Sequence, residues 1–111
     1  MEKKNPKELY PIPTPMKSGV RAKLRSMAAD MPAIMQIGKG GLTQNLIITV
    51  SDALEARELI KLSVLENAEC PARLFAEELS AEINAEVVAV IGRKIILYRR
   101  SINGKKHIEL E

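Results

Sequence analysis

The chain has 111 residues, of which 46% are apolar but only 3% aromatic, so it has the size of one domain with an aliphatic core. Its formal net charge is +3, and no apolar run approaches the roughly 18 residues that a membrane-spanning helix needs. A single cysteine and a single histidine exclude an intrachain disulfide framework and fall short of a metal site. The simplest interpretation is a cytoplasmic protein. We also expect a monomer without cofactor, membrane segment or small-molecule substrate.

Residues 1–16 are predicted to form a flexible leader. Pro6, Pro11, Pro13 and Pro15 disfavour helices and central strands, because proline lacks a backbone N–H and has a fixed φ. The segment also has no apolar stretch of the kind found in secretory signals.

The first predicted helix begins near Met16 and ends at Pro32. Lys17, Arg21 and Arg25 are four residues apart and therefore line one stripe of this helix. That stripe is either a solvated face or a row of phosphate contacts. A second, apolar stripe recurs at helical spacing and consists of Val20, Leu24, Met27, Ala28 and Met31.

A short strand is predicted at 33–37, where an apolar run lies between a proline and a glycine cluster. The cluster, Gly38-Lys39-Gly40-Gly41, is predicted to be a loop, since three glycines in four positions weaken any helix or strand. Thr43 is a good N-cap for the next helix. The apolar face of that helix comprises Leu46, Ile47, Val50, Ala53 and Leu54.

The second half of the chain continues this alternation. Residues 59–64 alternate apolar with polar side chains and predict a half-buried strand. Pro71 suits the first position of a third helix, and Asn84 suits a left-handed residue at its end. The inner stripe of this helix is Phe75, Ala76, Leu79 and Ile83.

A hairpin and a polar tail are predicted to close the chain. Residues 86–91 and 94–99 indicate two strands joined by Gly92-Arg93 in a type II′ turn. In the tail, 101–111, Ile108 and Leu110 are candidates for extending an edge strand. The resulting order, α-β-α-β-α-β-β, indicates an α/β fold with a four-stranded mixed sheet packed with three helices.

The junction of strand, glycine loop and helix is the strongest local signal for a binding site. A Gly-x-x-Gly loop lets a phosphate approach the backbone because no Cβ intervenes, and the N–H groups that begin the next helix add positive potential. Lys39 places a mobile cation at the loop tip. The spacing matches neither a Walker A loop nor a dinucleotide-binding loop. The alternative interpretation is a tight left-handed turn that only joins strand to helix.

Charge is distributed unevenly along the chain. Residues 1–25 carry seven Lys or Arg against two Glu, residues 92–107 carry six against none, and residues 66–86 carry six Glu against one Arg. This asymmetry indicates a polyanion-facing surface and a separate acidic one. Further candidate phosphate contacts, which position a protein without reading sequence, are Arg93 and Lys94 at the hairpin turn and Arg99 and Arg100 at its far end.

No catalytic constellation is visible in the sequence. His107 is expected at the surface of the tail, and Cys70 is expected to be a buried or half-buried structural residue. The carboxylates of the third helix are expected to form a solvent-facing row. We therefore do not expect an enzyme.

Several blocks of the sequence, in the right order, resemble the CRM domain family (chloroplast RNA splicing and ribosome maturation). They correspond to its opening helix, glycine loop, helix-to-strand junction and closing hairpin, and they read RAKLRSMA (21–28), IGKGGLT (37–43), ALEARELIK (53–61), and VIGRK with LYR (90–94 and 97–99). The likeness covers about residues 17–100 and is strongest to the stand-alone bacterial form of the domain. The leader lies outside the family pattern.

The resemblance implies a domain related to the C-terminal domain of translation initiation factor three. It also implies association with ribosomal RNA in precursors of the large ribosomal subunit, whereas plant members act in group II intron splicing. Binding would be dominated by the phosphate backbone and would weaken with salt. The family's glycine loop carries over to Gly38, Lys39, Gly40 and Gly41, and its basic surface to Arg21, Arg25, Arg57, Lys61 and Arg93.

Two other interpretations stay open. A protein–protein adaptor would use the acidic third helix or an exposed sheet edge, and its partner would survive nuclease treatment. A DNA-binding protein would use the same cations, and competition between duplex DNA and structured RNA distinguishes it from an RNA-binding protein.

Overall fold

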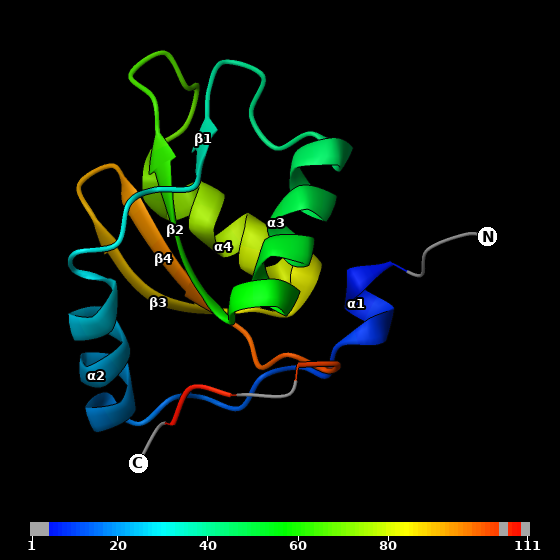
Figure 1. Ribbon diagram of the computed structural model, residues 1–111. Coiled ribbons are helices and arrows are strands. Elements are labelled where there is room, and N and C mark those ends of the chain that lie inside the picture. Colours follow the sequence, from blue (N-terminus) through cyan, green and yellow to red (C-terminus); the bar gives the residue numbers. More distant parts are fainter. Residues whose placement is uncertain (1–4, 105–106, 110–111) are drawn as a thin grey trace.

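The computed structural model describes residues 5–104 and 107–109, and it contains one sheet with helices against both faces (Figure 1). The helices are α1 (Pro6–Leu9), α2 (Ser18–Ala28), α3 (Gln44–Arg57) and α4 (Ala72–Ile83). The strands are β1 (Met35–Ile37), β2 (Leu59–Val64), β3 (Glu86–Ile91) and β4 (Lys94–Tyr98). From α2 onward, this is the element order predicted from the sequence.

The four strands form a mixed sheet in the order β1-β2-β4-β3. β1 is parallel to β2, with α3 as the crossover, and β4 is antiparallel to both β2 and β3. In the closing hairpin Ile91 lies opposite Lys94, and Gly92 has φ +59°, as the predicted type II′ turn requires. The predicted fold class is confirmed.

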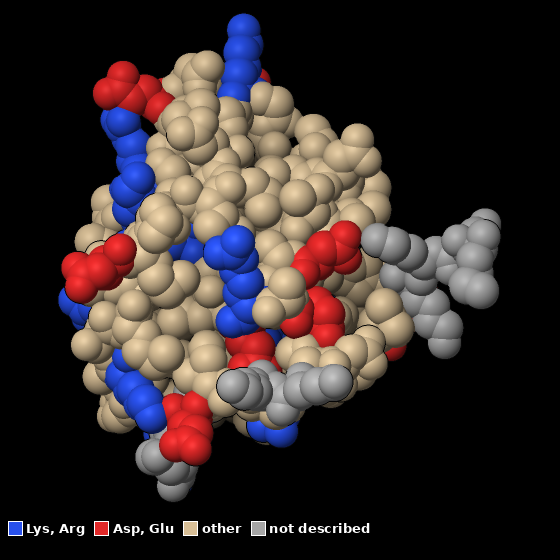
Figure 2. All heavy atoms as spheres, viewed as in Figure 1, with Lys and Arg blue, Asp and Glu red and all other residues tan. Residues whose placement is uncertain are grey.

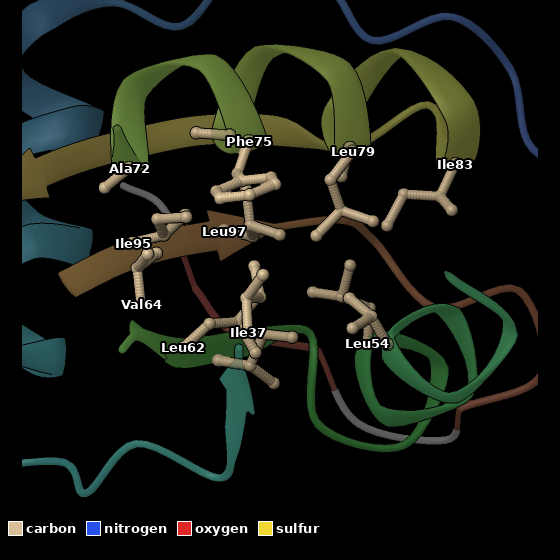
Figure 3. Packing of buried hydrophobic residues seen from close by; sticks show 14 residues of the cluster. Ile37, Leu54, Leu62, Val64, Ala72, Phe75, Leu79, Ile83, Ile95 and Leu97 are labelled. Carbon is tan, nitrogen blue, oxygen red and sulfur yellow. The ribbon is translucent and has the colours of Figure 1, made fainter. Parts of the chain in front are cut away.

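The main core lies between one face of the sheet and the helices α3 and α4. Figure 3 shows Phe75, Leu79 and Ile83 pointing from α4 toward the sheet, with Leu54 of α3 closing the side of the cluster. Leu54, Leu79 and Ile83 are fully buried. Full burial of one such side chain stabilises by roughly 1.5–3 kcal/mol, so this contact fixes both helices on the sheet.

The opposite face of the sheet is covered by α2. Leu24 and Ala28, both fully buried, pack there with Leu59, Ile96 and Tyr98. Because both faces are covered, the central strands carry nearly continuous apolar residues. β2 is therefore more buried than the alternation in the sequence predicts, with four of its six residues buried.

The segment 5–16 is mostly exposed, but it contains the helix α1, and Pro6 and Tyr10 of this segment are buried. Pro6 is the first residue of α1, where a proline forfeits no helical hydrogen bond. Asn84 donates from Nδ2 to the carbonyls of Lys7 (3.1 Å) and Tyr10 (2.7 Å), and Tyr10 is buried. The prediction that the prolines prevent a helix in this segment is therefore wrong for Pro6–Leu9.

Two carboxylates from the end of α3 hold the tail. Glu55 and Glu58 accept hydrogen bonds of 2.7–2.9 Å from four backbone N–H groups, those of Ser101, Ile102, Asn103 and Ile108. Ile108 packs against the α2 side of the sheet and is not in a strand, so its predicted extension of an edge strand is wrong. Leu110, the other candidate for that extension, lies outside the described residues.

The predicted capping residues agree with the structure more closely than the predicted first and last residues of the helices do. Thr43 caps α3 by accepting from Leu46 N–H (3.1 Å), and Asn84 is left-handed with φ +51°, both as predicted. α2 already ends at Ala28, and Pro71 is the N-cap of α4 rather than its first residue. Within the described ranges, no helix has the length and apolar character to cross a membrane.

Candidate functional site

Three loops meet at one end of the sheet: in Figure 1 the loops after β1 and β2 lie at the top and the β3–β4 turn lies at the upper left. β1 and β2 are parallel, so the loops that follow them leave the same edge. The β3–β4 turn joins them because β4 begins where β2 ends, with Lys94 opposite Ser63. We call residues 38–43, 65–71 (the middle loop) and 92–94 (the hairpin turn and Lys94) the three-loop end.

Backbone hydrogen bonds tie these loops into one unit. Leu65 N–H donates to the Ile37 carbonyl (2.9 Å), which links the middle loop to the base of the glycine loop. Val64 N–H donates to the Arg93 carbonyl (2.8 Å), which links it to the hairpin turn. Lys94 Nζ also donates to Ser63 Oγ (3.2 Å). The loops therefore present their side chains in a fixed relative arrangement.

Two glycines of the glycine loop have structural reasons to be glycine. Gly41 donates its N–H to the Gly38 carbonyl (3.0 Å), which closes a tight turn, and has φ +66°, a conformation that residues with a Cβ rarely adopt. A Cβ on Gly38 would lie 3.3 Å from Leu65 Cδ1. This part of the loop fits the alternative interpretation of a plain connecting turn.

Gly40 is different, because nothing in the fold requires its lack of a side chain. Among the described residues, no atom lies within 4 Å of the place that a Cβ on Gly40 would take, and the φ of Gly40 is not in the left-handed region. The exposed backbone at Gly40 lies beside the exposed side chain of Lys39. An anion can therefore reach the backbone here, next to a mobile cation.

The start of α3 adds positive potential behind this turn. Thr43 Oγ1 satisfies the N–H of Leu46, while the N–H groups of Gln44 and Asn45, in the first turn, have no acceptor within the helix. The first eight residues of α3, 44–51, carry no charged side chain. The helix dipole at this end is therefore not neutralised by an acid on α3 itself.

Lys and Arg side chains at the three-loop end are interspersed with acids. Lys39, Arg93 and Lys94 are exposed there, as predicted. Arg93 Nη1 forms an ion pair with Glu66 Oε1 of the middle loop (3.1 Å). Figure 2 shows Lys and Arg side chains over this part of the surface with acidic side chains among them, rather than an unbroken basic patch.

Sequence reasoning missed Arg73, which lies exposed in the first turn of α4, directly after the middle loop. The missed signal was topological. Two consecutive strand-to-helix junctions in a parallel pair lie at the same edge, so the second junction belonged with the first. The same argument places Glu66 and Glu69 at this end, where the charge pattern had only indicated a separate acidic surface.

The predicted basic stripe of α2 lies on the other face of the sheet, away from the glycine loop. Lys17 and Arg25 are exposed. Arg21 instead donates from Nη1 to the carbonyls of Val87 and Val88 and lies 3.8 Å from a Glu86 carboxylate oxygen. Arg21 therefore fixes α2 to the edge strand β3, and its guanidinium is already engaged.

Two more predicted cations are separated from the three-loop end. Arg57 is exposed at the last residue of α3, about 20 Å along the helix from its start at 1.5 Å per residue. Lys61 is half-buried in the middle of β2 and donates from Nζ to the Ala29 carbonyl (3.2 Å). The structure thus brings together the glycine loop, Arg93 and Lys94, and leaves the other cations elsewhere.

Arg99 is inside the protein. It is 5% exposed and donates to Ser51 Oγ (2.9 Å), the Ser51 carbonyl (2.6 Å) and the Ile83 carbonyl (3.0 Å). Burial lowers the pKa of its guanidinium. The interpretation of Arg99 as a phosphate contact at the surface is wrong, whereas Arg100 beside it is exposed.

The two residues considered for reactivity also differ from expectation. Cys70 is exposed, so the expected burial is wrong. His107 is half-buried, and its Nδ1 is bonded to the buried Glu58 carboxylate. Burial alone would raise the pKa of Glu58, but hydrogen bonds from His107, Ser101 and Ile108 lower it. Among the described residues, no group of three or more His, Cys, Asp or Glu could hold a metal ion.

Comparison with known proteins gives consistent results. The family profile described as CRS1 / YhbY (CRM) domain matches residues 16–99. The protein named probable RNA-binding protein YqeI of Bacillus subtilis is 46% identical over 87 residues, covering 78% of this chain and 90% of that protein. A protein of Haemophilus influenzae named RNA-binding protein is 29% identical over 82 residues, covering 74% of this chain and 83% of its own length.

A solved structure shares the fold. The solution structure of the hypothetical protein SAV1595 of Staphylococcus aureus superimposes with a TM-score of 0.71 at 44% sequence identity. The superposition covers 86% of this chain and 100% of the SAV1595 chain. The two proteins are therefore similar in both fold and sequence.

Proposed function

Because the chain belongs to the CRS1 / YhbY (CRM) domain family, we propose that it binds RNA through phosphate contacts at the three-loop end. The names of its relatives support RNA as the partner. The observation that carries the location is Gly40, whose exposed backbone has no structural need for glycine and lies beside Lys39. The N-terminus of α3 behind it favours an anion at the same place.

The proposed contacts are backbone contacts rather than readout of bases. Lys39, Lys94 and the amides near Gly40 can each donate to a phosphate oxygen, and such contacts fix position and register without reading sequence. The chain has two Tyr, one Phe and no Trp, and both Tyr10 and Tyr98 are buried. Other RNA-binding domains stack aromatic side chains on unpaired bases, but this chain has few aromatic side chains available for such stacking.

The proposal extends to ribosomal RNA in precursors of the large ribosomal subunit, as the family resemblance implies, and to a role without catalysis. Sedimentation of a cell lysate through a sucrose gradient tests this part. We expect the protein to co-migrate with the large subunit or its precursor at low salt and to leave it at high salt. Sedimentation with free protein at low salt would contradict it.

Binding by the three-loop end is tested directly with the Lys39→Glu variant and a structured fragment of large-subunit ribosomal RNA. Lys39 is exposed, so the variant should fold, and one reversed charge at a phosphate contact should weaken binding at least about tenfold. Lys7→Glu is the matched control, since Lys7 is equally a surface lysine but lies in α1 beside Glu82 at the other end of α4. Equal affinity of Lys39→Glu and wild type would contradict the location and favour the adaptor interpretation.

A further inference from the structure

The ion pair between Glu66 and Arg93 lies inside the proposed RNA-binding end rather than beside it. Glu66 directly follows Leu65, whose N–H is bonded to the base of the glycine loop, and Arg93 is bonded through its carbonyl to Val64. The 3.1 Å contact between Arg93 Nη1 and Glu66 Oε1 therefore joins the loop that follows β2 to the turn that precedes β4, and these two strands are neighbours in the sheet. The position of this acid is set by the fold and not by a free loop.

The pair is exposed and therefore easily exchanged. The side chains of Arg93 and Glu66 are 58% and 83% exposed, and such a surface pair is weak, because water solvates both charges well. A guanidinium prefers a two-pronged contact with a phosphate to a single contact with a carboxylate. Phosphate arriving at this end can therefore take Arg93 from Glu66, but the carboxylate remains nearby and repels it.

We propose, on the basis of the RNA-binding function above, that Glu66 competes with RNA phosphate for Arg93 and thereby restrains affinity at the three-loop end. A single phosphate at Arg93 gains little, because it only exchanges one weak ion pair for another and stays close to the Glu66 carboxylate. A backbone that also contacts Lys39 and Lys94 gains enough to displace Glu66. The acid thus favours an RNA shape that engages all three cations together over any polyanion that touches one.

The test is the dissociation constant of the ribosomal RNA fragment for Glu66→Gln, Arg93→Gln and the double variant. Glu66→Gln removes the competitor and should tighten binding roughly twofold to fivefold, which corresponds to the free energy of one exposed ion pair. Arg93→Gln should weaken binding less in the wild-type background than in the Glu66→Gln background, where Arg93 is free for phosphate. Neither change touches a backbone bond of Val64 or Leu65, and circular dichroism verifies folding of each variant.

Glu69→Gln is the matched control, since Glu69 is another exposed acid of the same loop, so its substitution changes net charge equally. We expect Glu69→Gln to tighten binding less than Glu66→Gln. Equal tightening by the two variants, or tightening by Glu66→Gln that persists fully in the Arg93→Gln background, would mean a net-charge effect and would overturn the proposal. No tightening by Glu66→Gln, with Lys39→Glu still weakening binding, would overturn this inference alone. Unchanged binding of Lys39→Glu would count against the proposed function itself.

Discussion

The guanidinium of Arg99 lies over the ring of Tyr10, with 3.3 Å between its central carbon and the ring centroid. Through this contact the end of β4 and the segment before α2 are packed together against α3. Tyr10 also donates from its hydroxyl to Glu55 Oε1 (2.7 Å), and the same carboxylate binds the tail. Burial and this hydrogen bond to Glu55 raise the pKa of Tyr10 to about 12, so the hydroxyl remains a donor throughout the physiological range.

Tyr10 is therefore expected to stabilise the domain although it lies in the proline-rich segment. Tyr10→Ala should lower the free energy of unfolding by about 2–4 kcal/mol, because it removes a buried ring and its contact with a buried cation. Tyr10→Phe keeps the ring and should cost only about 1 kcal/mol for the lost hydrogen bond. Urea denaturation followed by circular dichroism measures both. A loss below about 0.5 kcal/mol for Tyr10→Ala would show that the Tyr10 side chain does not stabilise the fold.

The lowered pKa of Glu55 predicts that the stability of the fold depends on pH. Burial alone would raise its pKa, but hydrogen bonds from Ser101, Tyr10, Ile102 and Asn103 lower it from 4.5 to about 2. Because the folded pKa is below the unfolded one, Glu55 stabilises the fold fully above about pH 4.5 and loses this contribution as the pH falls toward 2. Glu55→Gln should therefore be less stable than wild type at pH 7, with the difference shrinking in that window. Parallel stability curves for the two proteins from pH 7 to 2.5 would contradict the assignment.

Gly40 and Gly41 are expected to respond differently to the same substitution. Gly41→Ala puts a Cβ at φ +66° and should destabilise the fold by about 1 kcal/mol. The Cβ of Gly40→Ala meets no atom of the described residues within 4 Å, so stability should be unchanged. Affinity for RNA should fall, because the added Cβ would stand where we propose that phosphate approaches the backbone. Thermal melts and RNA titrations of both variants measure this separation. If Gly40→Ala binds RNA as wild type does, close backbone approach at Gly40 is not part of binding.

Arg21 of α2 is a structural cation, whereas Lys17, the N-cap residue of the same helix, is a surface cation. Arg21→Ala loses the bonds to the carbonyls of Val87 and Val88 and should destabilise the fold by about 1–3 kcal/mol. Lys17→Ala alters an exposed side chain and should stay within about 0.5 kcal/mol of wild type. Denaturant unfolding of the two variants tests the assignment, and equal stabilities would mean that Arg21 is not needed to fix α2 to β3.

The sequence contained enough information to predict the elements, because their signals are local. Thr43 and Asn84 mark a helix start and a helix end by their own backbone preferences, and Gly92 determines the hairpin turn. The apolar periodicities are equally local and predict the buried face of each helix, except at Met27, which was assigned to the apolar stripe of α2 but is 43% exposed. These features specify the α/β fold and the glycine loop without knowledge of any long-range contact.

The partners of charged residues could not be predicted in this way. Arg99 follows a strand in a run of cations, and only the packing of α3 and α4 shows that it is buried. Arg21 lies on a regular basic stripe, but its acceptors are carbonyls of an edge strand whose pairing with β4 is irregular between Val87 and Ala89. Glu66 and Arg93 are far apart in sequence and meet only because β2 and β4 are adjacent. In each case tertiary structure decides whether a cation is available for binding.

The most direct test of the central claim, that RNA binds at the three-loop end, is an NMR titration of the backbone amides with a structured fragment of large-subunit ribosomal RNA. We predict the largest shift changes at 38–45, 65–73 and 92–94, and much smaller ones along the acidic outer face of α4. Changes confined to other surfaces, or their absence at RNA concentrations that saturate binding, would contradict the claim.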